Sequence, residues 1–466
     1  MHDLAPASLP ESRDERRARG KKKRRQLPRR MFAEFSGATR DPMAIIAEQN
    51  ATRLQELLPL RTERMSQSPF AFYRGTAALM AADLAGEPTT GILVPSCGDA
   101  HVANFGFYAS PQRTLVFDLN DFDEAAWAPW EWDLKRLIGS IVIAGQSTER
   151  DEPIVREAVT TAVSAYALAM RTAARASPLR RYYAHFDAAA GTGNMHPKSR
   201  NVLDRAIKQA KRRTGERASR KLTHADESGW LTFVPRPPTM VPLEPELQAL
   251  QLELMRNYLD SATADINLHM RHYRPVDAIR RVVGVGSVGT RCALSLFQDG
   301  DGNTLILQSK QAGRSVLEQY GGIEQPAELV SLMRERGQGG RVVAMQRILQ
   351  AVSDPFLGSL RHSDEQFGEL ELYVRQFHDM KGGIEIEELE DEPFVTYARA
   401  CAVTLARAHA QSPNAAIIGG YLGSGTSVGE ALLEWGMKYA QRSREDYHLF
   451  LATAVASESA TPRISG

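Results

Sequence analysis

Long apolar runs are missing from this chain of 466 residues, and cysteine is scarce. The longest apolar stretch, residues 137–145, is about half the roughly 18 residues that a membrane-spanning helix needs. The three cysteines, Cys97, Cys292 and Cys401, form neither a CxxC pair nor an even set for a disulfide framework. The N-terminus has no apolar core for a secretory signal. We therefore expect a soluble protein of the cytoplasm, without a membrane span.

An excess of charge of one sign is also missing, since the formal net charge is only +1. Residues 1–30 nevertheless hold 11 Lys/Arg against four Asp/Glu, which leaves residues 31–466 at −6. No aromatic residue separates these cations for base stacking, so we predict that residues 1–40 form a disordered, solvated arm. The alternative is a weak contact with nucleic acid or an anionic surface through residues 13–30, because clustered cations release counterions from polyphosphates.

The hydrophobic pattern changes its period along the chain. Helical spacing predicts helices at residues 42–60 and 71–84, and short apolar strands follow at 91–96 and 114–118. Residues 131–270 are mostly helical by pattern. From residue 280 the pattern alternates, and strands at 282–284, 292–297 and 304–310 predict a three-stranded hairpin arrangement. Further helices are predicted at 327–336, 341–351, 394–411 and 430–453, with a strand at 371–377.

The segment from Gly98 to Asn104 is the first with a chemical pattern. Asp99 and Asn104 are five residues apart, which is the spacing of the kinase catalytic loop. A carboxylate there accepts the proton of an acceptor hydroxyl, while the amide oxygen helps to hold a cation that neutralises the transferred phosphoryl group. The alternative is a strand end whose Asp caps the next helix.

Acidic residues crowd the end of the second short strand. Asp118, Asp121, Asp123 and Glu124 lie within seven positions, and such carboxylates repel one another unless a cation is present. We therefore predict a metal site here. The rival chemistry is a metal-dependent hydrolase that uses Asp99, His101, Asp121 and Asp123, but it leaves the glycine-rich segment below unexplained.

Gly284, Gly286 and Gly289 form a GxGxxG pattern, which on its own is weak evidence. A dinucleotide site would open a helix directly after the last glycine, whereas residues 290–297 continue as an alternating strand. That favours a phosphate-covering flap followed by a strand that carries Lys310. A glycine-rich hairpin with a surface lysine stays open as the alternative. Calcium is excluded at residues 299–310, since Thr304 and Lys310 replace the required Gly and Glu.

Long motifs resemble the uncharacterised bacterial family called domain of unknown function 2252, over most of residues 60–450. They are SPFAFYRG at 68–75, GDAHVANFG at 98–106, FDLNDFDEA at 117–125, WDLKRL at 132–137, VVGVGSVGTR at 282–291, YVRQFHDMKG at 373–382 and LARAHA at 405–410.

A more remote resemblance is to aminoglycoside phosphotransferases and choline-kinase-like enzymes. Those proteins carry a GDxHxxN loop, an Asp-aromatic-acid triplet like Asp121 to Asp123, and an aspartate that opens a helix, like Asp133. Their LAxLH-like helix precedes the catalytic loop, whereas its match here, residues 405–409, lies near the far end of the chain. The resemblance therefore implies a circular permutation, which an exposed connection tolerates when the old termini lie close together.

The resemblance implies an α/β (α+β) kinase-like fold with a small antiparallel sheet lobe and a larger helical lobe. Its expected parts are a basic arm (1–40), a helical lobe with the catalytic and metal loops (41–270), a β-rich nucleotide-binding lobe (271–385) and helices that complete the helical lobe (386–466). The implied cofactors are ATP and Mg²⁺, and the implied partner is a small-molecule acceptor. The implied activity is phosphoryl transfer to a hydroxyl; AMP transfer and a catalytically silent nucleotide sensor or scaffold are the alternatives.

The same resemblance assigns roles to individual residues. They are Asp99 as base with His101 beside it, Asn104, Asp121 and Asp123 at the metal, and Gly284, Gly286, Ser287, Gly289 and Lys310 at the nucleotide phosphates. Residues 373–377 would be the hinge strand that meets the adenine. A helix glutamate should pair with Lys310, and Glu318, Glu328 and Glu335 are the candidates. Cys97 stands where the relatives usually have His. Arg74 is a candidate for binding an anionic acceptor, and a buried structural arginine is the alternative.

Overall fold

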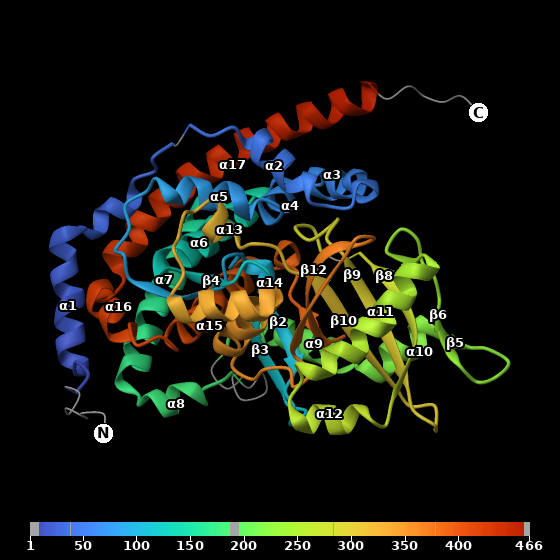
Figure 1. The fold of residues 1–466 in the computed structure, drawn as a ribbon. Coiled ribbons are helices and arrows are strands. Elements are labelled where there is room, and N and C mark those ends of the chain that lie inside the picture. Colours follow the sequence, from blue (N-terminus) through green and yellow to red (C-terminus); the bar gives the residue numbers. More distant parts are fainter. Residues whose placement is uncertain (1–8, 38, 187–194, 283, 378, 461–466) are drawn as a thin grey trace.

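The computed structural model describes residues 9–37, 39–186, 195–282, 284–377 and 379–460, with side chains up to residue 455. It is a mixed α/β structure in which a lobe built on an antiparallel sheet lies beside a larger, mostly helical lobe (Figure 1). Within these residues no helix is long and apolar enough to cross a membrane. All three cysteines are buried and free.

Six antiparallel strands form the sheet of the smaller lobe, in the order β11-β12-β10-β9-β8-β7. Their bounds are β7 (Met240–Pro242), β8 (Arg274–Arg281), β9 (Cys292–Gln298), β10 (Thr304–Gln311), β11 (Gly358–Asp364) and β12 (Gly368–Gln376). Strands β8, β9 and β10 pair in succession, with Arg280 opposite Ala293 and Cys292 opposite Lys310. The predicted arrangement of three paired strands is present, but its first strand is β8, which ends at Arg281 before the predicted position 282–284. Residues 284–289 lie in the connection from β8 to β9.

Both faces of this sheet are covered, as the alternation of its residues requires. In β10, Leu305 and Leu307 join the apolar cluster of α11 (Pro245–Asn257), η4 (Tyr258–Asp260) and α12 (Ala264–Met270). Ile306 points to the other face, which α10 (Gly215–Leu222), β5 (Thr223–Ala225) and β6 (Leu231–Phe233) cover. The expected boundary at residue 270 is thus corrected, because residues 215–270 bury their apolar sides against the sheet.

The helical lobe is centred on α6 (Trp130–Ser147), whose residues are buried from Trp130 to Gly145. Around it pack α7 (Glu152–Arg175), α15 (Asp391–His409), α16 (Ala415–Leu422) and α17 (Thr426–Ala460), all in one continuous apolar core. Two further helices follow α7: α8 (Pro178–Tyr182) lies below α7, and α9 (Pro197–Lys211) lies nearer the sheet lobe, against β13 and α15 (Figure 1). The C-terminal helices α15 to α17 therefore complete the lobe that α6 begins.

Short strands place the two predicted acidic segments. Strand β1 (Leu93–Ser96) pairs with β4 (Ala126–Pro129), and β2 (Phe105–Ala109) lies between β13 (Gly382–Gly383) and β3 (Leu115–Leu119). A single 3-10 turn, η3 (Val102–Asn104), separates β1 from β2. Strand β13 follows β12 along the chain, so the polypeptide crosses from one lobe to the other between them.

Within the described part of the expected disordered arm, residues 9–37 and 39–40, most of the chain is helical, which corrects that expectation; residues 1–8 and 38 lie outside the described residues. A capping box of Ser12 and Glu15 starts α1 (Arg13–Gln26), and α1 packs along α16. Gly20 allows this approach, since a Cβ there would lie 1.9 Å from the Ile417 carbonyl oxygen. Arg24 donates from Nε to the Tyr421 carbonyl at 2.8 Å, so part of the basic charge serves helix docking.

The remaining elements are short connections, with one exception. They are η1 (Arg29–Ala33), α2 (Pro42–Ala51), η2 (Gln55–Leu57), α3 (Leu58–Ser66), α4 (Pro69–Arg74), α5 (Ala77–Ala85), α13 (Val316–Gln319) and η5 (Ile386–Glu388). The exception is α14 (Ala327–Leu349), which packs on β11 and β12 and is interrupted at Gly337. This interruption explains the two separate helices predicted at 327–336 and 341–351.

Candidate functional site

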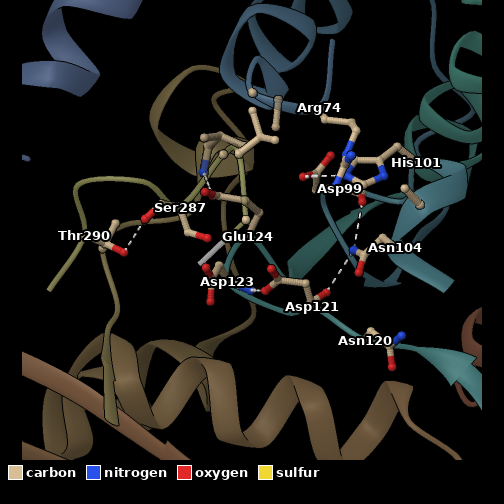
Figure 2. Close-up of a pocket in the computed structure, with 18 of the residues that line it drawn as sticks. Arg74, Asp99, His101, Asn104, Asn120, Asp121, Asp123, Glu124, Ser287 and Thr290 are labelled. Atoms are coloured by element: carbon tan, nitrogen blue, oxygen red, sulfur yellow. Dashed lines mark hydrogen bonds and ion pairs between the residues drawn. The ribbon is translucent and has the colours of Figure 1, made fainter. Parts of the chain in front are cut away.

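A cavity of about 720 Å³ brings together segments that are almost two hundred residues apart in the sequence. Asp99, His101, Asn104, Asp121 and Asp123 line one part of it, and Gly284, Gly286 and Ser287 line another (Figure 2). Gly289 and Lys310 are not among its lining residues, although Lys310 contacts two of them. The acidic segments and the glycine segment therefore border one cleft.

Asp133, in the first turn of α6, holds the loop that carries Asp99. Its carboxylate accepts the backbone N–H of Cys97 at 2.6 Å and that of Gly98 at 2.9 Å. Gly98 has a φ of +79°, and a Cβ there would lie 2.3 Å from the Glu124 carbonyl oxygen. The loop needs glycine at this position both for its left-handed backbone and for its close contact with the acidic segment.

Asp133 also binds the far end of the chain. His409, at the end of α15, lies with Nε2 3.1 Å from the Asp133 carboxylate, and its Nδ1 lies 2.7 Å from the Tyr166 hydroxyl. All three side chains are buried. Asp133 therefore links the LARAHA helix to the start of the loop that carries Asp99.

Asp99 is held by an arginine that sequence reasoning did not single out. Arg136 donates from Nε to Oδ1 of Asp99 at 2.8 Å, and its guanidinium lies 3.8 Å from the centre of the Tyr73 ring. The other oxygen, Oδ2, is 3.6 Å from His101 Nε2. The Asp99 side chain keeps 23% of its surface exposed, so one carboxylate oxygen is available to the cleft.

His101 is neutral at ordinary pH. Burial, with the nearby charges of Arg74 and Arg136, lowers the pKa of His101 to about 4 despite the opposing charge of Asp99. Its Nδ1 is buried and has no hydrogen-bond partner among the described residues. The neutral ring adds no positive charge beside Asp99, and at 3.6 Å it makes no hydrogen bond with that carboxylate.

Asn104 and Asp121 lie at the base of the cleft. The Asn104 amide nitrogen donates to the carbonyls of Asp99 at 3.0 Å and Asp121 at 3.2 Å, which orients the amide and leaves its oxygen as the remaining polar atom. Desolvation opposes ionisation of Asp121, but the charges of Lys310, Arg375 and Lys381 outweigh it and lower the pKa of Asp121 to about 2. Its side chain is 44% exposed, so this carboxylate is ionised and open to the cleft.

Asp123 is engaged differently. One oxygen accepts the Tyr373 hydroxyl at 2.7 Å, and the other forms an ion pair with Lys310. The Lys310 ammonium also lies 3.9 Å from Asp121, and these two carboxylates hold its pKa above the ordinary value although burial lowers it. The expected helix glutamate is therefore corrected: Asp123 takes that place, and none of the three candidate glutamates contacts Lys310 among the described residues.

The glycine segment is fixed from outside by the N-terminal helices. Leu54 donates its N–H to the Gly289 carbonyl at 2.8 Å, and Arg53 donates to the Val288 carbonyl. Arg64 donates to the Gly284 carbonyl at 2.5 Å. Gly289 has a φ of +91°, and a Cβ there would lie 2.9 Å from Arg53. Residues 53–64 thus cover the outer side of a segment that borders the cleft.

A family model for an uncharacterised protein conserved in bacteria, DUF2252, matches residues 53–453. The chain belongs to the DUF2252 family. Comparisons with curated proteins and with solved structures found no match. The DUF2252 match covers the cleft residues from Arg53 onward, whereas Glu48, Gln49 and Thr52, which also line the cleft, precede it.

Several cleft residues of this DUF2252 chain escaped sequence reasoning. Arg53 and Lys381 line the cavity, and Arg341 donates to the carbonyls of Asp123 and Gly313 at 2.8 Å each. Burial and the charge of Arg375 lower the pKa of Lys381 to about 8. Lys381 and Arg136 do lie inside the family motifs YVRQFHDMKG and WDLKRL, but no spacing rule identifies them.

The donor set fits a hard cation only in part. No group of three or more His, Cys, Asp and Glu side chains among the described residues is arranged to hold a metal. Asp121 supplies an exposed, ionised carboxylate and Asn104 an amide oxygen, which are the ligand types that Mg²⁺ takes when phosphate oxygens complete its shell. Asp123 fits less well, because both of its oxygens already have partners.

Proposed function

We propose that this chain is a Mg-ATP-dependent phosphotransferase that acts on the hydroxyl of a small molecule. One observation carries the proposal: Asp99, Asp121 and the glycine segment border one cleft although they lie far apart in the chain, and Lys310 lies behind it in contact with Asp121 and Asp123. The kinase-like relationship and the permuted order belong to this proposal. Residues 373–377, at the end of β12, would meet the adenine.

The proposed reaction transfers the γ-phosphoryl group of ATP to the acceptor hydroxyl. The acceptor oxygen forms a bond to the γ-phosphorus of ATP, the bond to the bridging oxygen breaks, ADP leaves, and the acceptor proton passes to Asp99. Asp99 is suited to this role because Arg136 fixes its carboxylate while part of the side chain stays accessible. Lys310 would bind phosphate oxygens by charge-assisted hydrogen bonds.

Asn104 and Asp121 would hold Mg²⁺, which neutralises negative charge on the phosphate oxygens when it is bound. The protein's own contribution at this point is orientation. Arg341 fixes the backbone at Asp123, and the Asp121 carbonyl is fixed by Asn104. The exposed carboxylate of Asp121 therefore has a defined direction into the cleft.

Asp121→Asn tests the proposal, with a thermal-shift titration of ATP and ADP in the presence and absence of Mg²⁺. We expect the wild-type chain to be stabilised by Mg-ATP, and the variant to lose at least tenfold in apparent affinity because it loses an anionic ligand. Asp301→Asn, in the exposed turn between β9 and β10, removes the same charge and should behave as wild type. Equal Mg-ATP affinity in both variants would contradict the metal role of Asp121.

A catalytically silent nucleotide sensor is the second candidate, and the ion pair between Lys310 and Asp123 favours it. A nucleotide must compete with Asp123 for the ammonium group, which reduces the gain from phosphate binding. Mg-ATP stabilisation without formation of ADP or pyrophosphate across a panel of hydroxyl acceptors would support the sensor. Release of pyrophosphate in place of ADP would instead identify AMP transfer.

A further inference from the structure

Arg74 ends α4 and lines the cleft on the side where Asp99 lies. Figure 2 shows its side chain beside His101 and Asp99. The charge of Arg74 contributes to keeping His101 neutral. It is thus a cation that lines the cleft near the place where the acceptor hydroxyl must lie if Asp99 is the base.

The Arg74 guanidinium has no carboxylate partner. No Asp or Glu oxygen lies within ion-pair distance of it among the described residues, and its Nε is buried without a hydrogen-bond partner. Asp99 does not need this cation, since Arg136 already donates to it at 2.8 Å. A half-buried guanidinium with unused donors beside a cleft is a ready site for an anion.

The sequence SPFAFYRG holds Arg74 in a fixed position. The Ser68 hydroxyl caps α4 by accepting the Ala71 N–H at 3.0 Å, and the residues from Phe70 to Tyr73 are buried. The Tyr73 carbonyl accepts from Arg136 at 2.7 Å. Arg136 therefore binds both Asp99 and the residue before Arg74, which sets the distance between the two cleft groups in advance.

We propose that the acceptor carries a negatively charged group, a carboxylate or a phosphate, which Arg74 binds while the acceptor hydroxyl lies at Asp99. The hydroxyl placement rests on the proposed function, whereas the anion site does not. The site would select anionic over neutral hydroxyl compounds. It would bind the anion independently of the nucleotide, because the glycine segment and Lys310 serve the nucleotide.

Calorimetric titration of the full chain with inorganic phosphate, and in a second arm with acetate, tests the anion site. Each titration is run alone and in the presence of saturating Mg²⁺ and a non-hydrolysable ATP analogue. We expect Arg74→Gln to weaken binding of the preferred anion at least tenfold and Arg74→Lys to restore part of it. Arg314→Gln, which removes a more exposed arginine of the same cleft, should leave binding unchanged. The arm with the tighter binding identifies the anion as phosphate or carboxylate.

Equal anion binding by wild type and Arg74→Gln, or no binding of either anion to the wild type, would overturn the proposal. Exclusion of the anion by the ATP analogue would also overturn it, since Arg74 would then serve the nucleotide. Asp121→Asn separates the two proposals because it should lose the nucleotide and keep the anion. If the wild-type chain binds no nucleotide but binds the anion, and Arg74→Gln loses the anion, the phosphotransferase proposal is refuted and the anion site is supported. Circular dichroism and melting curves confirm that each variant is folded.

Discussion

Replacement of Asp133 by Asn is the sharpest test of how the cleft is built. The carboxylate accepts three hydrogen bonds: Oδ1 takes the Gly98 N–H, and Oδ2 takes the Cys97 N–H and lies 3.1 Å from His409 Nε2. An amide offers one oxygen, so its NH₂ group must face at least one backbone N–H. The variant keeps the size of the side chain and changes only this pattern.

The cost follows from those contacts. The least costly orientation places the NH₂ group against Gly98, which removes one charge-assisted hydrogen bond of about 1.5–3 kcal/mol and leaves a buried donor unsatisfied. The two remaining bonds weaken because the acceptor becomes neutral. We expect Asp133→Asn to lower the free energy of unfolding by about 3 kcal/mol and to reduce Mg-ATP affinity, since the loop carrying Asp99 and Asn104 loses its anchor.

Urea unfolding and nucleotide titration measure the two effects separately. Asp277→Asn is the matched control, because Asp277 also accepts two backbone N–H groups, from Phe233 and Ala278, and one side-chain donor, Gln248. It lies on β8 and does not line the cleft, so it should lose stability while it retains nucleotide affinity. Unchanged stability in Asp133→Asn, or the same loss of nucleotide affinity in both variants, would refute this reasoning.

Two further predictions concern the docking of α1 and the neutral histidine. Gly20→Ala places a Cβ against the Ile417 carbonyl, so α1 should shift and lose about 1–3 kcal/mol of packing energy, which faster hydrogen exchange in residues 13–26 would show. Ala18→Ser, on the exposed side of α1, is the control and should leave the exchange unchanged. Unaltered exchange in Gly20→Ala would contradict this packing. The pKa of His101 is about 4 in the folded chain, whereas its ordinary value is 6.5. Between these two pH values only the unfolded state takes up the proton. The free energy of unfolding should therefore fall as the pH decreases from about 6.5 to 4, by up to about 3 kcal/mol. His101→Gln should lack this part of the fall, and parallel urea-unfolding profiles over that pH range would disprove the burial effect.

Local patterns were enough to predict the elements that carry the site. The alternation after residue 290 predicted β9 and β10, and the glycines at 284–289 predicted the connection before β9, because both signals are contained in a short stretch of chain. The preceding strand was placed too late, at 282–284, whereas β8 ends at Arg281. The motifs WDLKRL and LARAHA, far apart in the sequence, contain Asp133 and His409, which are in contact; the permuted phosphotransferase order that the resemblance implies stays a prediction.

Partners that depend on packing could not be predicted. Lys310 has candidate glutamates at helical spacing in the sequence, yet Asp123 reaches it because Arg341 fixes the acidic segment against β10 and β12. Arg136 is indistinguishable by pattern from any arginine of an amphipathic helix, and only its burial beside Tyr73 directs it to Asp99. Gly20 on α1 and Gly420 on α16 allow these two helices to pack closely. The many cations of α1 predicted a solvated arm instead, because composition does not show where two glycines meet.

The link between Asp133 and His409 has a consequence for biosynthesis. A ribosome makes the acidic segments near residues 99–133 long before it makes their counterparts, Lys310 and His409. During that interval the nascent chain holds carboxylates whose stabilising contacts do not yet exist, and burying them unpaired is unfavourable. The cleft can therefore mature only after most of the polypeptide has been translated, so premature termination before α15 yields products without a working site.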